Sequence, residues 1–164
     1  MSFRHIEQLN VVRDEFDTIL GATEYVRIHW QEAAGHLESV HLYELEAAMD
    51  RLEATYVVRL TAGYEAVVFE ALQKLKVRKV HEKASGVELT DALSGWLQDS
   101  IKATAPRLTS SDRRKIKEVK ARAANVRDLL RYRNKIAHRK PPEDEEFGFA
   151  SARSCLNLML DLIP

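Results

Sequence analysis

The sequence predicts an all-α fold, an antiparallel bundle of four or five helices. Apolar residues recur three and four positions apart along most of the chain, and alternation of β-branched residues is rare. Only six glycines and four prolines interrupt 164 residues. A chain of this length with 45% hydrophobic residues can bury one ordinary core but is too short for two comfortable domains. We therefore expect one domain over residues 1–164.

The first two predicted helices are the longest apolar elements. The first is expected to open with Ser2 as its cap and to run through the twenties, with Leu9, Phe16 and Ile19 on its buried face. The second is expected to run from about Val40 to Val77. It contains the segment YVVRLTAGYEAVVFEAL, which is apolar on most of its faces. Such a helix must be buried on most faces, which predicts the central helix of the bundle.

Three charged residues interrupt this apolar segment: Arg59, Glu65 and Glu70. Arg59 and Glu70 are eleven residues apart, about three turns, and share a helix face. We expect Arg59 to pair with Glu70 or with an acid of another helix. This interpretation favours a structural arginine over one that supports an active site.

The segment RKVHEKASGVEL reads as a polar loop, after which Thr90 is expected to begin a shorter helix. Pro106 ends that helix or lies just beyond it. Ser110 or Ser111 with Asp112 can cap the next helix.

That next helix is strongly basic and is expected to continue to about Ala137. Two prolines follow, and the acids of PPEDEE favour the start of a last helix, because anions stabilise a helix N-terminus. The last helix is expected to run from Phe147 or Phe149 through Leu162.

The formal net charge of zero conceals a strong segregation of charge. Residues 101–140 contain 14 lysines or arginines against three acids, a local balance of +11, so the rest of the chain carries −11. A one-sided positive field suits a polyanionic partner such as RNA. A charged helix that merely solvates itself, or that docks on the acidic parts of the same chain, is the competing interpretation.

Cysteine usage and hydropathy indicate a reducing, cytoplasmic location. Cys155 is the one cysteine, so no intrachain disulfide can form, and its apolar neighbours favour a small buried hydrophobe over a nucleophile. No apolar run approaches the roughly 18 residues of a membrane span. The first residues mix acids with apolar residues, which argues against a targeting peptide.

The stretch RYRNKIAHRKPP brings a chemically competent cluster to the end of the basic helix. Asn134 and His138 are four residues apart and therefore neighbours on one helix face, and Arg133 is one step round. An imidazole with a pKa of about 6.5 can transfer a proton at neutral pH. A guanidinium can bind a phosphate through two donors and stabilise charge that develops on phosphorus. These are the kinds of group needed to cleave RNA without a metal.

The motif Arg133-Asn134-Lys135-Ile136-Ala137-His138, at the end of a basic penultimate helix in an all-α chain, resembles that of the HEPN superfamily. Members of that superfamily carry an Arg-x4-6-His motif, very often RNxxAH. The segment YVVRLTAGYEAVVFEAL is also similar to the central helix of HEPN proteins of the toxin and defence type.

The resemblance implies a metal-independent endoribonuclease that leaves a 2′,3′-cyclic phosphate and a 5′-hydroxyl. His138 would transfer the proton, Arg133 would bind the scissile phosphate, and Asn134 would orient the histidine or the ribose. Flanking phosphates would be anchored by the neighbouring cations, and Tyr132 is expected either to stack on a base or to pack against the protein. These cations are Arg131, Lys135, Arg139 and Lys140.

The resemblance also implies a homodimer. One Arg–His pair supplies too few groups for both proton transfers, so a two-fold axis near the motif would bring two pairs into one cleft. Apolar helix faces beside the motif would supply the interface.

One position departs from a known subgroup. In HEPN toxins silenced by a nucleotidyltransferase antitoxin, a tyrosine follows the histidine after one residue and becomes adenylylated. Lys140 stands at that position here. Regulation by that route is therefore not expected, whereas an antitoxin or defence partner of another type stays open.

The sequence offers no comparable second site. His41 and Glu44 have a spacing that a metal could use, and His36 is nearby, but no third or fourth ligand is evident, so we expect no metal and no cofactor. The alternative to the ribonuclease is a non-catalytic helical module that binds nucleic acid, a nucleotide or a protein through the same basic face.

Overall fold

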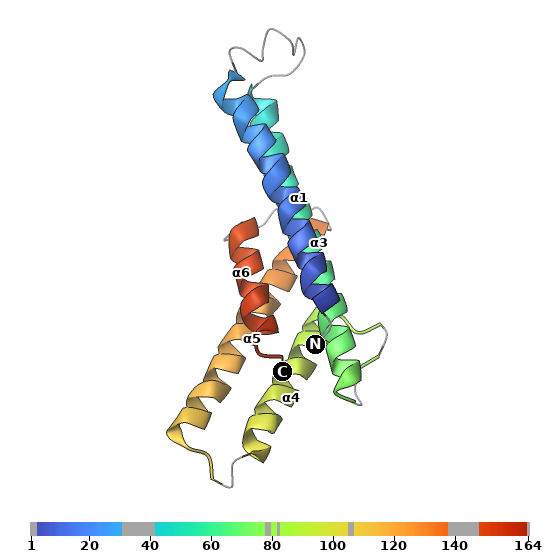
Figure 1. Ribbon diagram of the computed structural model, residues 1–164, viewed down its shortest axis with the longest axis vertical. Coiled ribbons are helices and arrows are strands. Elements are labelled where there is room, and N and C mark those ends of the chain that lie inside the picture. Colours follow the sequence, from blue (N-terminus) through green and yellow to red (C-terminus); the bar gives the residue numbers. More distant parts are fainter. Residues whose placement is uncertain are drawn as a thin grey trace.

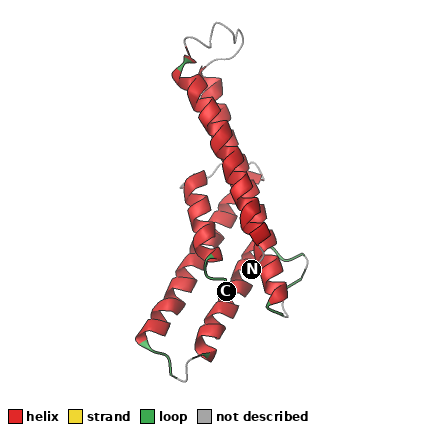
Figure 2. Cartoon of the chain, viewed as in Figure 1, coloured by secondary structure: helices red, strands yellow, loops and turns green. Residues whose placement is uncertain are grey.

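The computed structural model describes residues 3–30, 42–77, 80–81, 83–104, 107–137 and 148–163. Within these residues the chain is helical and contains no strand (Figure 2). The all-α prediction is therefore confirmed. The five helices described are α1 (Phe3–Ile28), α3 (Leu42–Lys74), α4 (Gly86–Ala103), α5 (Ser110–Ala137) and α6 (Phe149–Leu160).

Helix α3 is the central element, as its apolar sequence predicts, because it packs against each of the other four helices. α1 and α3 form a long antiparallel pair whose far end projects beyond α4, α5 and α6 (Figure 1). The half of α3 that follows Thr55 lies inside the bundle, where α4, α5 and α6 cover it. The basic helix α5 runs antiparallel to α4 and α6 on one side of α3.

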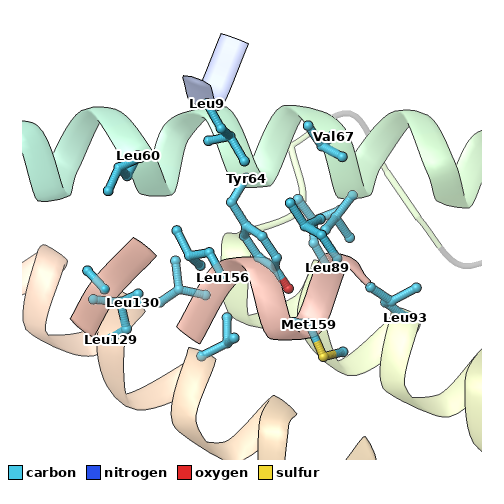
Figure 3. Packing of buried hydrophobic residues seen from close by; sticks show 14 of the residues in the cluster. Leu9, Leu60, Tyr64, Val67, Leu89, Leu93, Leu129, Leu130, Leu156 and Met159 are labelled. Carbon is cyan, nitrogen blue, oxygen red and sulfur yellow. The ribbon is translucent and has the colours of Figure 1, made fainter. Parts of the chain in front are cut away.

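The core is built around Tyr64, whose ring lies among aliphatic side chains from all the helices (Figure 3). Its hydroxyl lies 3.1 Å from Thr90 Oγ1 of α4, and burial raises the pKa of the phenol well above its usual range. A buried hydroxyl with a partner avoids the cost of an unsatisfied polar group. The aliphatic side chains labelled around it are Leu9, Leu60, Val67, Leu89, Leu93, Leu129, Leu130, Leu156 and Met159.

Leu60→Ala is expected to lower the free energy of unfolding by about 2–5 kcal/mol. Leu60 is 1% exposed, so truncation removes buried methyl groups and leaves a cavity. Urea denaturation measures this loss. Leu158→Ala is the control, because Leu158 is 46% exposed and its loss should change stability by less than about 0.5 kcal/mol. Equal losses in the two variants would contradict the assigned core.

Helix α1 packs on α3 through a narrower face than its sequence predicts. Leu9 and Phe16 are buried. Leu9 packs closely on Gly63, since a Cβ added to Gly63 would lie 2.9 Å from Leu9 Cδ2. Ile19, which we expected to be buried, is 40% exposed. α1 packs mainly against one helix, α3, so the face that it buries is narrow and leaves Ile19 outside.

Arg59 pairs with an acid of another helix, one of the two predicted arrangements. Its guanidinium lies 2.5 Å from Glu15 of α1 and 5.0 Å from the centroid of the Tyr56 ring. The predicted alternative partner, Glu70, instead contacts Lys74 at 2.5 Å. The Arg59 pair is largely exposed, which indicates a surface link between α1 and α3.

Two helix starts differ from the predictions. α4 begins at Gly86, four residues before Thr90, because Ser85 and Glu88 form a reciprocal capping box. Glu88 accepts the Ser85 N–H at 2.7 Å, and this bond lowers the pKa of the Glu88 carboxyl. At α5 the predicted serine caps are wrong, because Thr109 exchanges hydrogen bonds with Asp112 instead.

Helix α6 begins at Phe149, one of the two predicted starts, and ends at Leu160, two residues before the predicted end. The carboxylate of Glu53 accepts the Phe149 N–H at 2.7 Å, so a side chain of α3 satisfies a free donor at the start of α6. Ser2, Pro106 and the acids of residues 143–146 lie outside the described residues, and their predicted roles remain predictions. Within the described stretches, no helix has the length and apolar character needed to cross a bilayer.

Candidate functional site

Arg133, one turn before the end of α5, reaches inward to the central helix α3. Its Nη2 donates a hydrogen bond to Glu65 Oε1, across 68 positions of sequence. The arginine side chain is 20% exposed and the glutamate side chain 23% exposed. At this degree of burial a charge requires a partner, so the two groups fix the register between α5 and α3 at this point.

A cleft of about 260 Å³ opens beside this ion pair. It lies where α3, α5 and the start of α4 meet. Its volume is below the roughly 300–1,000 Å³ typical of pockets for drug-sized ligands, so it suits a group smaller than a whole cofactor. The lining residues are Glu65, Ala84, Ser85, Gly86, Val87, Leu130, Arg133 and Asn134.

The Glu65 carboxylate lies between two sources of positive charge. One is the Arg133 guanidinium, and the other is the N-terminus of α4, since a Cβ added to Gly86 would collide with Glu65 Oε1. Gly86 is thus the residue that allows the carboxylate to approach the helix start. The arrangement places the Glu65 carboxylate at this junction.

Arg133 keeps donor capacity beyond its bond to Glu65. Its Nε–H is buried and has no hydrogen-bond partner among the described residues. A guanidinium has five N–H donors in a fixed plane, so a partner on one edge orients the others. Glu65 therefore holds the arginine in place through Nη2, while the buried Nε–H lacks a partner among the described residues.

The other predicted site residues surround this cleft unequally. Asn134 lines the cleft, whereas Arg131 is not part of its lining and pairs with Asp128 at 3.0 Å. Lys135 is exposed, and Tyr132 is half-buried against the core, which favours packing over base stacking. His138, Arg139 and Lys140 lie outside the described residues, so their predicted roles stay predictions.

Gly86→Ala tests whether Glu65 supports Arg133. The new methyl group would displace the carboxylate and leave a buried guanidinium without its partner, so we expect a loss of about 1–3 kcal/mol in the free energy of unfolding. Gly95→Ala in the same helix is the matched control, because the methyl group that alanine adds there meets no packing atom within 4 Å. The control should gain about 0.5–1 kcal/mol. Equal urea midpoints for the two variants would refute the role of Glu65.

Other candidate groups form no comparable site within the described part of the chain. Cys155 is half-buried against the core, less buried than predicted, and burial raises the pKa of its thiol to about 11, so it is protonated at neutral pH. No three histidine, cysteine, aspartate or glutamate side chains in the described ranges cluster as metal ligands. The predicted candidates His36 and His41 lie outside those ranges, and Glu44 is described.

Comparisons with known proteins identify no relative: no family model, no curated protein and no solved structure matches the chain. The site therefore has to be interpreted from its own geometry. Sequence reasoning missed the roles of Glu65 and Gly86. The available signals were an acid inside the most apolar segment, and a serine–glycine pair three residues before a glutamate.

Proposed function

We propose that this chain is a metal-independent endoribonuclease of the HEPN type. The observation that carries the proposal is Arg133, which belongs to an RNxxAH motif, lines a cleft of about 260 Å³ and has one donor without a hydrogen-bond partner among the described residues. The concentration of cations on α5 adds support, because RNA is a polyanion. A role in a toxin system or in phage defence, a cytoplasmic location and an antitoxin or defence partner are parts of the same proposal.

The proposed reaction is an internal transfer at one RNA linkage. The ribose 2′-oxygen loses its proton, attacks the adjacent phosphorus and displaces the 5′-oxygen of the next nucleotide, which takes up a proton. The products are a 2′,3′-cyclic phosphate and a 5′-hydroxyl. Arg133 binds the non-bridging oxygens, whose charge grows during the attack, and His138 moves a proton. Asn134 orients the imidazole or the ribose.

The reaction requires one group to accept a proton and another to donate one. A single imidazole serves one of these roles in a given step, so we propose that a second copy of the chain supplies the other imidazole. Sedimentation of the pure protein tests this part. If the protein is a monomer under conditions in which it cleaves RNA at full rate, the two-chain site is wrong, and the residues of one chain suffice for the reaction.

A non-catalytic module is the second candidate, and one observation favours it. The Glu65 carboxylate already engages Arg133, so the guanidinium is partly neutralised and could be a purely structural group. In that case the basic helix would bind nucleic acid, a nucleotide or a protein without turnover.

Incubation of the pure protein with labelled RNA in excess EDTA separates the two candidates. The ribonuclease predicts cleavage that persists in the chelator. Binding of RNA by the wild type without cleavage, at any concentration that saturates the RNA, would favour the module and overturn the enzyme.

A further inference from the structure

Most cations of α5 lie along one line of the helix surface. Their intervals of three, four and seven residues keep side chains on one face of an α-helix. Ala124 falls on the same line, in its longest interval, and adds only a methyl group. We call this line the basic stripe, and it consists of Arg113, Lys117, Lys120, Arg127, Arg131 and Lys135.

The basic stripe lies mainly on the solvent-exposed surface of the helix, away from its buried residues. All its members are exposed except Arg127, which is half-buried. At a rise of 1.5 Å per residue, Arg113 and Lys135 lie about 33 Å apart along the helix axis. The C-terminal end of the stripe lies beside the cleft, because Arg131 and Lys135 flank Arg133 and Asn134 in the last two turns of α5.

Much of the charge on the basic stripe is uncompensated. Arg127 contacts Asp91 of α4 at 2.5 Å, and Arg131 contacts Asp128 at 3.0 Å. Arg113, Lys117, Lys120 and Lys135 have no ion-pair partner among the described residues. The excess positive charge is therefore greatest in the half of α5 that is distant from the cleft.

Stability of the helix does not explain this placement. Arg113 and Lys117 lie in the first two turns of α5, where the positive end of the helix dipole disfavours cations. A helix face that merely solvates itself gains from acids and bases alternating four residues apart. The three acids of α5 lie off the stripe: Asp112 bonds to Thr109, Glu118 pairs with Arg122, and Asp128 pairs with Arg131.

We propose that the basic stripe binds the sugar–phosphate backbone of the RNA strand on one side of the cleavage point. The inference rests on the proposed function and specifies its substrate. At about 3.4 Å per phosphate in a stacked strand, 33 Å corresponds to roughly ten nucleotides. The stripe carries no aromatic or amide side chain along its length, so it reads phosphates and not bases. The substrate is thus a strand that extends well beyond the cut, recognised with little regard to sequence.

The test compares two double substitutions that each remove two positive charges from the same end of α5. Lys117→Ala with Lys120→Ala removes charge from the stripe. Arg114→Ala with Lys115→Ala removes exposed charge off the stripe. Both are made with and without His138→Ala, so that binding can be measured without cleavage. Circular dichroism and thermal unfolding verify that both variants are folded.

Binding is measured by fluorescence anisotropy with an unstructured oligouridine of about 20 nucleotides, roughly twice the length of the stripe. The stripe variant should lose affinity on the order of tenfold, and its plot of log affinity against log salt should be shallower by about 1.4, or 0.7 per phosphate contact. The off-stripe variant should stay within about twofold of the parent. Equal losses in both variants, or no loss in the stripe variant, would overturn the proposal.

Cleavage separates failure of this inference from failure of the proposed function. The stripe variant should show a raised KM for the long oligouridine and unchanged cleavage of an oligouridine of about three nucleotides, which is too short to reach Lys120. If the stripe variant cleaves both substrates at wild-type efficiency, the stripe does not bind the substrate, whereas the proposed ribonuclease activity stands. If the wild type binds RNA through the stripe but does not cleave it, the proposed ribonuclease activity is wrong, whereas RNA binding by the stripe stands. Tighter binding of polyglutamate than of oligouridine at equal salt would identify a protein-docking face and overturn the inference.

Discussion

Replacing His138 with alanine is expected to slow RNA cleavage by roughly 10²–10⁴-fold, the contribution of a positioned proton-transfer group. Because the proposed reaction requires the imidazole to change its protonation state, the wild-type rate should depend on pH near neutrality, and the variant should lack this dependence. Single-turnover rates across the pH range measure both effects.

His29→Ala provides the control for that experiment. His29 directly follows α1, and its ring stacks on Tyr25, so its loss should leave the rate and the pH profile unchanged. Binding of RNA by His138→Ala should stay within about threefold of the wild type, since the imidazole contributes little to phosphate binding. A variant that keeps its full cleavage rate would remove the imidazole from the reaction.

Arg133→Lys is expected to lower the cleavage rate by roughly 10²–10³-fold, although it preserves the positive charge. Lysine keeps a contact with Glu65 but loses the planar fork that can hold the glutamate on one edge and a phosphate on the other. The loss should appear in kcat more than in KM, because the second contact strengthens as charge develops on phosphorus.

The matched control is Arg131→Lys in the same turn of the helix. Arg131 is exposed and, among the described residues, pairs with Asp128 alone, so this change should alter the rate by less than about threefold. If Arg133→Lys cleaves as well as Arg131→Lys, Arg133 is a structural partner of Glu65, and the non-catalytic module becomes the better account.

The sequence predicts the bundle well where a single periodic pattern is strong. The periodic pattern of α5 predicts a buried line of Ile116, Val119, Ala123, Val126, Leu129 and Leu130, and all of these are buried except Ile116, which is half-buried. The start of α4 is harder to predict from the sequence. A glycine directly after Ser85 indicates a loop, and the capping box becomes evident only when Ser85 and Glu88 are considered together.

The candidate site is harder to predict because it depends on tertiary register. Residues 131–135 are visible as a cluster in the sequence, but nothing in a periodic pattern connects Arg133 with Glu65, 68 positions away. Their contact follows from how α5 and α3 pack together, and Gly86 makes room for the carboxylate. Burial can be inferred from one helix at a time, whereas the partner of a buried charge cannot.

Chemical analysis of the RNA ends after a single turnover in excess EDTA tests the central claim most directly. The account predicts 2′,3′-cyclic phosphate and 5′-hydroxyl ends, formed at the wild-type rate in the chelator and lost together with the His138 imidazole. Ends that carry a 5′-phosphate, or cleavage that appears only when magnesium is restored, would contradict a reaction carried out by Arg133 and His138.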